Sequence, residues 1–325
     1  MSLAESSLVR PPALAPGDRV HVVSPAGPVV PEILADGLEI LDNWGLEVIV
    51  DNERVYHRHP PWEYLAGSDT ERHEALVDAW NDPKARAIMC SRGGYGAMRL
   101  LPHLDLEMLV EQPRLLVGFS DITALHLYLA GIGGLATLHG PVLKSMRVHR
   151  ETDPVDSLER LRQALFAESP APRRWTGMRT VRPGTASGPV FGGNLSLLIP
   201  LLGSPYCPSL DGAIVVLEDV GEQDYRIDRL LTALELAGDA DLAGLVLGEF
   251  TEIDDNVFVS PDRFDEFLDE RGARFDCPVV AGAPVGHEAR NAAFPVGVDA
   301  RLDADAGTLE FAHHAVRPPD SDESR

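Results

Sequence analysis

Residues 18–50, DRVHVVSPAGPVVPEILADGLEILDNWGLEVIV, contain one complete strand–helix–strand unit. The β-branched run over 18–23 predicts a strand, which ends in the turn Ser24-Pro25-Ala26-Gly27. Residues 31–43 then place apolar side chains at helical spacing, and residues 46–50 form a second β-branched run. A strand, a helix and another strand in this order build a parallel sheet with helices packed on its faces.

The same alternation continues through the first third of the chain. The pattern predicts a capped helix over 68–81, strands over 85–90 and 114–118, and a helix over 122–129. We therefore predict an α/β fold whose N-terminal domain has a parallel sheet of the Rossmann or flavodoxin-like type, similar to class I amidotransferases. Ligands in such folds bind at the carboxyl ends of the strands, so motifs that directly follow a strand are the first candidates for a site.

The sequence changes character after residue 150, and this change predicts a second domain. Residues 1–150 are assigned to the N-terminal domain, and the turn-rich residues 151–187 to an interdomain connection. Short strand and helix patterns over 188–315 predict a C-terminal mixed β/α domain. Residues 316–325 are rich in Pro, Asp and Ser and are predicted to form a disordered tail.

Composition limits the partners and the location of the protein. The net charge of -23 repels phosphate backbones, so we expect no nucleic-acid partner. No apolar run approaches the roughly 18–20 residues of a membrane helix, and the N-terminus lacks the basic and apolar parts of a secretory signal. The 3 cysteines form no CxxC pair, which favours reduced thiols. These features together predict a cytoplasmic protein.

Ser120 lies where an apolar strand runs directly into an amphipathic helix, in Val117-Gly118-Phe119-Ser120-Asp121-Ile122-Thr123. This pattern resembles a nucleophile elbow, in which a sharp turn exposes a serine hydroxyl at the positive end of a helix. It departs from Gly-x-Ser-x-Gly because Ile122 replaces the second glycine. Ser120 can equally be an ordinary helix N-cap with Asp121 in the first turn. The local sequence leaves both interpretations open.

A second motif, Arg92-Gly93-Gly94-Tyr95-Gly96, also follows a predicted strand and precedes a helix. Glycines at such a position let backbone N–H groups point at an anion or an oxyanion. The alternatives are a tight turn that needs positive φ, or a phosphate-binding loop. The motif lacks both the Gly-Lys-Ser/Thr end of a P-loop and the Gly-x-Gly-x-x-Gly spacing, which disfavours nucleotide binding.

The C-terminal half supplies an acidic motif and a histidine motif, each at the end of a strand. Glu218 and Asp219 follow an apolar run, where a carboxylate can orient a histidine, face solvent or bind a metal. His287 follows a strand and a glycine turn, which favours a catalytic role. Other histidines, including His57 and His59 in a polar loop, show no HExxH-like spacing, so we predict neither a metal nor a cofactor.

Taken in order, these motifs resemble the LD-carboxypeptidase family of serine peptidases, which includes muramoyltetrapeptide carboxypeptidases and microcin C immunity peptidases. The resemblance extends over roughly residues 14–311. No block is decisive alone, but their joint order is specific. The blocks that carry it are Val22–Gly27, Arg92–Gly96, Gly118–Thr123, His139–Pro141, Gly192–Leu195, Leu217–Val220, Tyr225–Arg229 and Gly286-His287.

The resemblance implies a serine peptidase that hydrolyses an amide bond through an acyl-enzyme. It implies a catalytic triad of Ser120, Glu218 and His287. It also implies an oxyanion hole made by the backbone amide of Asp121 and a glycine of the Arg-Gly-Gly-Tyr-Gly loop, which we assign to Gly94. A homodimer is the assembly expected from the family.

The expected activity is release of terminal D-alanine from murein tetrapeptide, a step of peptidoglycan recycling. A cation must then meet the terminal carboxylate, and Arg92 and Arg226 are the candidates, although a helix-surface ion pair is the alternative for Arg226. The second hypothesis is an immunity-type peptidase that cleaves aminoacyl-nucleotide amides. Such an enzyme needs an aromatic platform, for which Trp175 is the candidate, unless it packs the connection against a domain. A hypothesis of another class is a non-catalytic peptide-binding module.

Overall fold

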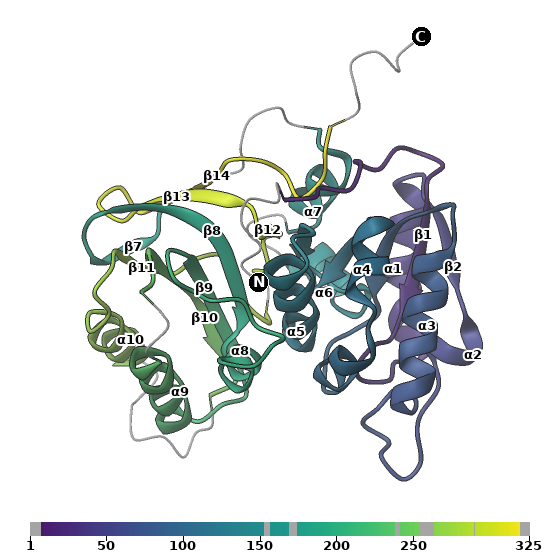
Figure 1. Cartoon of the computed structure of the whole chain (residues 1–325), viewed down its shortest axis with the longest axis horizontal. Coiled ribbons are helices and arrows are strands. Elements are labelled where there is room, and N and C mark those ends of the chain that lie inside the picture. The colour runs from purple at the N-terminus through teal and green to yellow at the C-terminus, as the bar shows by residue number, and fades with distance from the viewer. Residues whose placement is uncertain are drawn as a thin grey trace.

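The computed structural model describes residues 8–152, 157–168, 174–237, 241–253, 263–288 and 290–318. Two β-sheets, each with its own helices, form two lobes that lie side by side (Figure 1). None of the helices in these residues combines the length and apolar character needed to cross a membrane. Residues 319–325 of the predicted tail lie outside the described part. The predicted α/β class, with a largely parallel N-terminal sheet and a mixed C-terminal sheet, is confirmed.

The first sheet has six strands in the order β12-β5-β4-β3-β1-β2. Strands β1 to β5 pair in parallel, and β12, which comes from the far end of the chain, is antiparallel to β5. The chain order reverses between β1 and β3, so the carboxyl ends of these strands border the crevice where ligands bind in open α/β sheets. The strands are β1 Arg19–Val23, β2 Glu47–Val50, β3 Ala85–Cys90, β4 Leu115–Gly118, β5 Thr137–His139 and β12 Phe294–Val296.

The helices predicted over 31–43 and 68–81 begin within one residue of their predicted starts, and one region differs in type. Ser68 and Glu71 form a capping box at the start of α3. The helix predicted over 122–129 is a short 3-10 turn, one α-helical turn and a π-helical turn. The helical elements are α1 Pro31–Asn43, α2 Asn52–Val55, α3 Asp69–Asn81, η1 Ala97–His103, α4 Leu106–Glu111, η2 Ser120–Ile122, α5 Thr123–His126, η3 Leu127–Ile132, α6 Leu143–Thr152 and α7 Ser157–Phe166.

The second sheet has eight strands in the order β6-β14-β13-β8-β9-β10-β11-β7. Its centre, β8 to β11, is parallel and its flanks are antiparallel. Only residues 176–178 separate β6 from β7, which are the two edge strands, so the sheet must curl until its edges approach each other. The strands are β6 Arg174–Trp175, β7 Arg179–Arg182, β8 Thr185–Asn194, β9 Ile214–Val220, β10 Gly244–Thr251, β11 Val279–Ala281, β13 Asp299–Asp303 and β14 Thr308–Phe311.

The two lobes share one hydrophobic core. A single cluster of buried side chains includes Ile122 of the first lobe and Leu217 of the second. Helix α5 contacts α8 (Leu195–Leu201), and Figure 1 shows both between the two sheets. Helices α9 (Asp224–Leu236) and α10 (Phe264–Gly272) cover the outer side of the second lobe. This shared core holds the carboxyl ends of β4 and β9 in fixed relation.

The predicted connection over 151–187 contains ordered elements. Helix α7 packs against α6 on the first lobe, whereas β6 and β7 pair with strands of the second sheet. Strand β12 in turn returns from the C-terminal half to the first sheet. The exact domain boundaries drawn from the sequence remain a prediction.

Candidate active site

Ser120 is the first residue of η2, at the sharp turn from β4 into that helix, and has a φ of 64°. A non-glycine residue in this left-handed region is strained, which is how a nucleophile elbow exposes its side chain. Phe119 is the N-cap of η2, and no side chain caps that end. Ser120 is therefore not the helix cap that its local sequence also allows, and its hydroxyl is free to bond elsewhere.

Two glycines provide the room that this turn needs. A Cβ atom at Gly118 would lie 2.9 Å from Cγ1 of Ile122, and one at Gly93 would lie 2.8 Å from Cβ of Ser120. Both distances are shorter than real Cβ contacts, so a larger residue would displace the turn. Ile122, which replaces the second glycine of the elbow pattern, packs directly over Gly118 and leaves the serine accessible.

The structure brings Ser120, His287 and Glu218 together in one hydrogen-bonded row. His287 Nε2 lies 2.8 Å from Ser120 Oγ, and His287 Nδ1 lies 2.6 Å from Glu218 Oε2. The His287 side chain is 15% exposed and that of Glu218 is 0% exposed. Because a carboxylate only accepts, Nδ1–H donates to Glu218 and Nε2 is left to accept the hydroxyl proton of Ser120.

The surroundings of His287 favour its charged form. Burial lowers the pKa of the imidazole, but the charge of Glu218 and its hydrogen bond outweigh burial and raise that pKa above 6.5. Smaller contributions in the same direction come from Asp219 and Glu252. The Phe119 ring lies 4.8 Å from the imidazole ring and shields one side of it. The pair can thus take up a proton from Ser120 at low cost.

Asp219 has a structural role that the sequence left open. Its Oδ1 accepts from Asn194 Nδ2 at 2.9 Å, and its Oδ2 accepts from the backbone and hydroxyl of Ser196 at 2.9 and 2.6 Å. Burial raises the pKa of this carboxyl. Asp219 therefore faces the start of α8 rather than solvent, and in the described residues neither it nor Glu218 belongs to a metal-binding group.

Of the two residues predicted to form the oxyanion hole, Asp121 directly follows Ser120, and Gly94 follows Gly93, whose backbone packs against Ser120. Asp121 is in the first turn after the elbow, where backbone N–H groups have no partner within the helix. Its buried side chain accepts from the backbone of Ala97 at 2.7 Å, and burial raises its pKa to about 6. Gly94 has a φ of 114°, and the neighbouring Gly93 carbonyl accepts from Gly27 at 3.1 Å. The glycine loop is thereby fixed next to the serine.

The two candidate carboxylate-binding arginines have different surroundings. Arg92 donates to the carbonyls of Gly93 and Pro28 and, with Gly94, lines a cavity of about 600 Å³. No carboxylate lies within ion-pair distance of it among the described residues. Arg226 lies on α9, where it contacts Glu222 at 3.6 Å and the Tyr225 hydroxyl at 3.3 Å.

Several residues that support the site were not found from the sequence. Thr123 Oγ1 accepts from the backbone of Asn194 at 3.0 Å and joins the two lobes behind Ser120. Lys144 donates its backbone amide to Ser91 at 2.9 Å, and burial together with Arg92 lowers the pKa of its amine. Lys144 is one of only two lysines in the chain, which is the one local signal that sets it apart.

Trp175 cannot serve as an aromatic platform in this structure. Its side chain is 2% exposed, and its ring packs edge-on against Phe294 at 5.5 Å and Phe311 at 5.3 Å. The alternative interpretation of Trp175, as a residue that packs the connection against a domain, is the one that its burial supports. His139 is likewise buried and stacks on Phe294.

Comparison with known proteins connects this geometry to one family. The model of the LD-carboxypeptidase N-terminal domain matches residues 20–140, and that of the LD-carboxypeptidase C-terminal domain matches residues 187–302. A putative carboxypeptidase of Streptomyces coelicolor is 41% identical over 315 residues, covering 96% of this chain and 99% of that protein. The murein tetrapeptide carboxypeptidase of Pseudomonas aeruginosa is 34% identical, covering 88% of this chain and 93% of that protein.

Solved structures show the same fold. The muramoyltetrapeptide carboxypeptidase from Oxalobacter formigenes is similar with a TM-score of 0.77 and 28% identity, over 91% of this chain and 99% of that chain. The microcin C7 self-immunity protein MccF is similar with a TM-score of 0.83 over 95% of this chain and 100% of that chain. Its sequence identity of 23% supports the fold alone.

Proposed function

The chain belongs to the LD-carboxypeptidase family, and we propose that it releases terminal D-alanine from a murein tetrapeptide with Ser120 as its nucleophile. The observation that carries this proposal is the row Ser120–His287–Glu218, with hydrogen bonds of 2.8 and 2.6 Å. Relatives named murein tetrapeptide and muramoyltetrapeptide carboxypeptidase, at 34% and 28% identity, support the substrate class.

In the first half of the reaction, His287 Nε2 takes the hydroxyl proton while Ser120 Oγ attacks the amide carbon. Glu218 holds the imidazole by Nδ1 and stabilises its charged form. The amides of Asp121 and Gly94 donate to the oxyanion, and loss of one such donor typically costs ~3–4 kcal/mol. The C–N bond then breaks, and the proton on Nε2 passes to the nitrogen of the departing D-alanine.

In the second half, a water molecule attacks the acyl-enzyme carbonyl and gives its proton to Nε2 of His287. The ester bond to Ser120 breaks, and that proton returns to the serine oxygen. His287 begins and ends neutral. Glu218 stays ionised throughout because it only orients and stabilises the imidazole.

Arg92 is our candidate for binding the terminal carboxylate of the substrate, in preference to Arg226. Its guanidinium lies next to Gly94, within the loop that approaches Ser120, and it has no anionic partner in the described residues. An unpaired cation in a chain of net charge -23 is a local attractor for a substrate anion. Arg226, an exposed residue in the first turn of α9, instead pairs with Glu222, which precedes that helix, as a solvated helix residue does.

The second candidate is an immunity-type peptidase that cleaves an aminoacyl-nucleotide amide. The fold is compatible with it, because MccF shares the architecture. The aromatic platform expected at Trp175 is buried, however, so this chain offers no base-stacking surface at that position. The murein substrate is therefore favoured.

The cellular setting is part of the same proposal. We place the enzyme in the cytoplasm because Cys90, Cys207 and Cys277 are all free and buried, as expected for a reducing compartment. We expect no nucleic-acid or membrane partner. We expect a homodimer, which sedimentation of the purified enzyme would reveal as twice the chain mass.

The test is incubation of the enzyme with L-Ala-D-Glu-meso-diaminopimelate-D-Ala and measurement of released D-alanine. Ser120→Ala should lower turnover by about 10⁴-fold or more while leaving the thermal unfolding temperature close to that of the wild type. Cleavage of an aminoacyl-sulfamoyl adenosine without release of D-alanine would overturn the murein assignment. Full turnover by Ser120→Ala would exclude the proposed nucleophile.

A further inference from the structure

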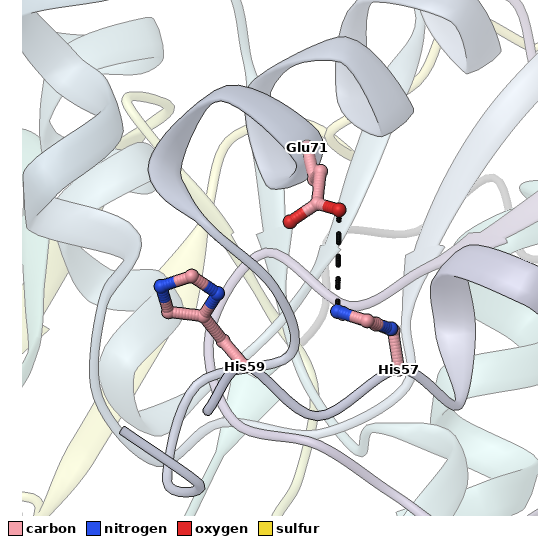
Figure 2. Close-up of side chains that lie close together, drawn as sticks. All are labelled: His57, His59 and Glu71. Carbon is pink, nitrogen blue, oxygen red and sulfur yellow. Dashed lines mark ion pairs between the residues drawn. The ribbon is translucent and has the colours of Figure 1, made fainter. Parts of the chain in front are cut away.

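A second cluster of histidine and glutamate side chains lies outside the candidate active site. His57, His59 and Glu71 each turn one ligand atom toward a common space, and these atoms all lie within 4.8 Å of one another (Figure 2). His57 Nε2 lies 3.9 Å from Glu71 Oε1. In the part of the chain that the structure describes, this is the one group of three such side chains close enough to hold a metal ion.

The local fold brings these residues together from both ends of one loop. His57 follows helix α2, and its amide donates to the carbonyl of Arg54 at 3.3 Å. The chain then turns back on itself, so that the His59 amide donates to the carbonyl of Leu65 at 3.1 Å. Leu65 is buried and anchors the base of the loop. The histidines thus face the first turn of α3, where Glu71 lies.

The capping box of α3 fixes the carboxylate of Glu71. Its Oε2 accepts from the amide and the hydroxyl of Ser68, both at 2.7 Å, which leaves Oε1 directed toward His57. The hydrogen bonds from Ser68, and more weakly the charges of His57 and His59, lower the pKa of Glu71. Gly67 keeps the space open, because a Cβ there would lie 3.3 Å from Glu71 Cβ and 3.5 Å from His57 Cδ2.

We propose that His57, His59 and Glu71 form a binding site for a divalent transition metal ion of the zinc type. Two imidazoles and one carboxylate are a ligand set that Zn²⁺ accepts, with a water molecule as the fourth ligand. Metal bonds of about 2.0–2.1 Å place tetrahedral ligands about 3.4 Å apart, so the present separations need only a small side-chain rotation. His57 is 42% exposed and Glu71 is 51% exposed, so the rotation meets no packed core.

The surroundings of the cluster favour a cation. His57 and Glu71 border a cavity of about 600 Å³ that opens to solvent. Its lining carries four carboxylates and two arginines: Asp51, Glu53, Glu71, Asp78, Arg54 and Arg72. The local balance is therefore negative, in keeping with the whole chain.

Metal binding would act on the active site through the loop. Arg58, which lies between the two histidines in the chain, and Glu63 and Tyr64, which lie between His59 and α3, line the cavity next to Arg92 and Gly94. The Tyr64 ring lies 6.0 Å from that of Tyr95 in the glycine motif. An ion held at both ends of the loop would restrain this wall of the cavity. The role is structural, since the cluster does not include Ser120, His287 or Glu218.

The alternative is a simple ion pair between protonated His57 and Glu71. Their exposed side chains and 3.9 Å separation make that pair weak. An ion pair needs only one histidine and no metal, whereas the metal site needs both histidines. Removal of His59 alone therefore distinguishes the two.

The experiment uses tag-free full-length protein that has been treated with a chelator and titrated with ZnCl₂ by calorimetry. We expect one Zn²⁺ to bind per chain. When the free zinc concentration is a hundredfold above Kd, the unfolding temperature should rise by about 4 °C. His57→Gln and His59→Gln should each weaken zinc binding by about tenfold or more and remove the temperature shift. His313→Gln, a change at an exposed histidine outside the cluster, is the matched control and should bind like the wild type.

Two results would overturn the proposal. One is the absence of stoichiometric zinc binding in the wild type. The other is unchanged binding in the His57→Gln/His59→Gln double variant. His57→Gln and His59→Gln each alter a partly exposed side chain. After treatment with the chelator, these variants should therefore unfold at the same temperature as the chelator-treated wild type, which separates loss of metal binding from misfolding. Ser120→Ala should bind zinc normally, so failure of the proposed peptidase activity leaves this test unaffected.

Discussion

Two histidine–glutamate pairs in this protein use the same functional groups in opposite environments. In the pair His287–Glu218 the atoms lie 2.6 Å apart, and the side chains are 15% and 0% exposed. In the pair His57–Glu71 they lie 3.9 Å apart, and the side chains are 42% and 51% exposed. Both residues of the first pair come from the second lobe, where their imidazole and carboxylate meet Ser120 of the first lobe, whereas the second pair bridges the two ends of one surface loop.

The difference shows what burial does to one kind of interaction. Away from water, the charge of Glu218 raises the pKa of His287 even though burial alone would lower it. At the surface, solvent and salt screen the second pair, and an ion pair there contributes little. Catalysis needs the buried pair to hold one geometry, while the exposed pair remains free to accept a third ligand.

The buried pair is tested most directly by Glu218→Gln, which removes the charge and keeps the shape. We expect kcat to fall by about 10³- to 10⁴-fold, because the imidazolium loses its counter-ion and its tautomer is no longer fixed. D-alanine release under saturating substrate measures the loss. Asp219→Asn is the matched control, since the neighbouring carboxylate bonds to Asn194 and Ser196 instead of His287. An equal loss of kcat in both variants would contradict the separate role of Glu218.

Gly93→Ala tests how precisely the glycine loop positions Ser120. The new Cβ would lie 2.8 Å from Ser120 Cβ and 3.0 Å from Ser120 Oγ, so either the serine or the loop must shift. A displacement of this size at a reacting group is expected to lower kcat by about 100-fold. Steady-state kinetics together with thermal unfolding would separate this effect from lost stability. If a stable Gly93→Ala variant kept the wild-type kcat, the loop would accommodate the added methyl group without displacing Ser120.

The electrostatics of the buried pair predict the pH dependence of the enzyme. His287 must be neutral to accept a proton. Because its pKa is raised, the imidazole is protonated, and so inactive as a base, at a higher pH than an ordinary histidine of pKa 6.5. We expect kcat/KM to fall about tenfold per pH unit on the acid side of a midpoint above 6.5. In Glu218→Gln, only the smaller contributions of Asp219 and Glu252 still oppose the effect of burial on the His287 pKa, so any residual activity should have a lower midpoint. A wild-type midpoint below 6.5 would argue against the pairing.

The exposed pair should show the smallest effect. Without metal, His57→Gln is expected to change the free energy of unfolding by less than about 0.5 kcal/mol, because the lost ion pair is screened by solvent. Urea unfolding at two ionic strengths would measure it. A larger loss would mean that His57 makes a contribution beyond its contact with Glu71.

The local elements were predictable because their causes are local. The strand over 85–90, the helix over 31–43 and the capping box at Ser68 follow from periodicity and capping within a few residues. Strands β6 and β12 were not found, since they have two and three residues and exist only through partners far along the chain. Pairing of this kind leaves no pattern in so short a segment.

The candidate site was likewise predicted only in part from the sequence. The sequence singled out Ser120 and Glu218 because each lies at the end of an apolar strand, and His287 because it follows a strand and a glycine turn. The family resemblance joined them. It left Ser120 balanced between nucleophile and helix cap, since both need the same strand-to-helix turn. The φ of 64° and the 2.8 Å contact with His287 distinguish the two. The catalytic roles themselves remain a prediction for kinetics to test.

The amino-acid sequence by itself determined the strand–helix order, the family and the chemical groups available at the strand ends, because these depend on neighbours in the chain. Only the tertiary structure decided which groups meet. Parallel pairing of β9, β10 and β11 brings Glu218 and His287 to one edge of the second sheet, and the core shared by both lobes places that edge at Ser120. A single loop brings His57 and His59 to Glu71. The distance between two residues far apart in sequence depends on how the core packs. That packing depends on the shapes of all the buried side chains together, so no local stretch of sequence determines it.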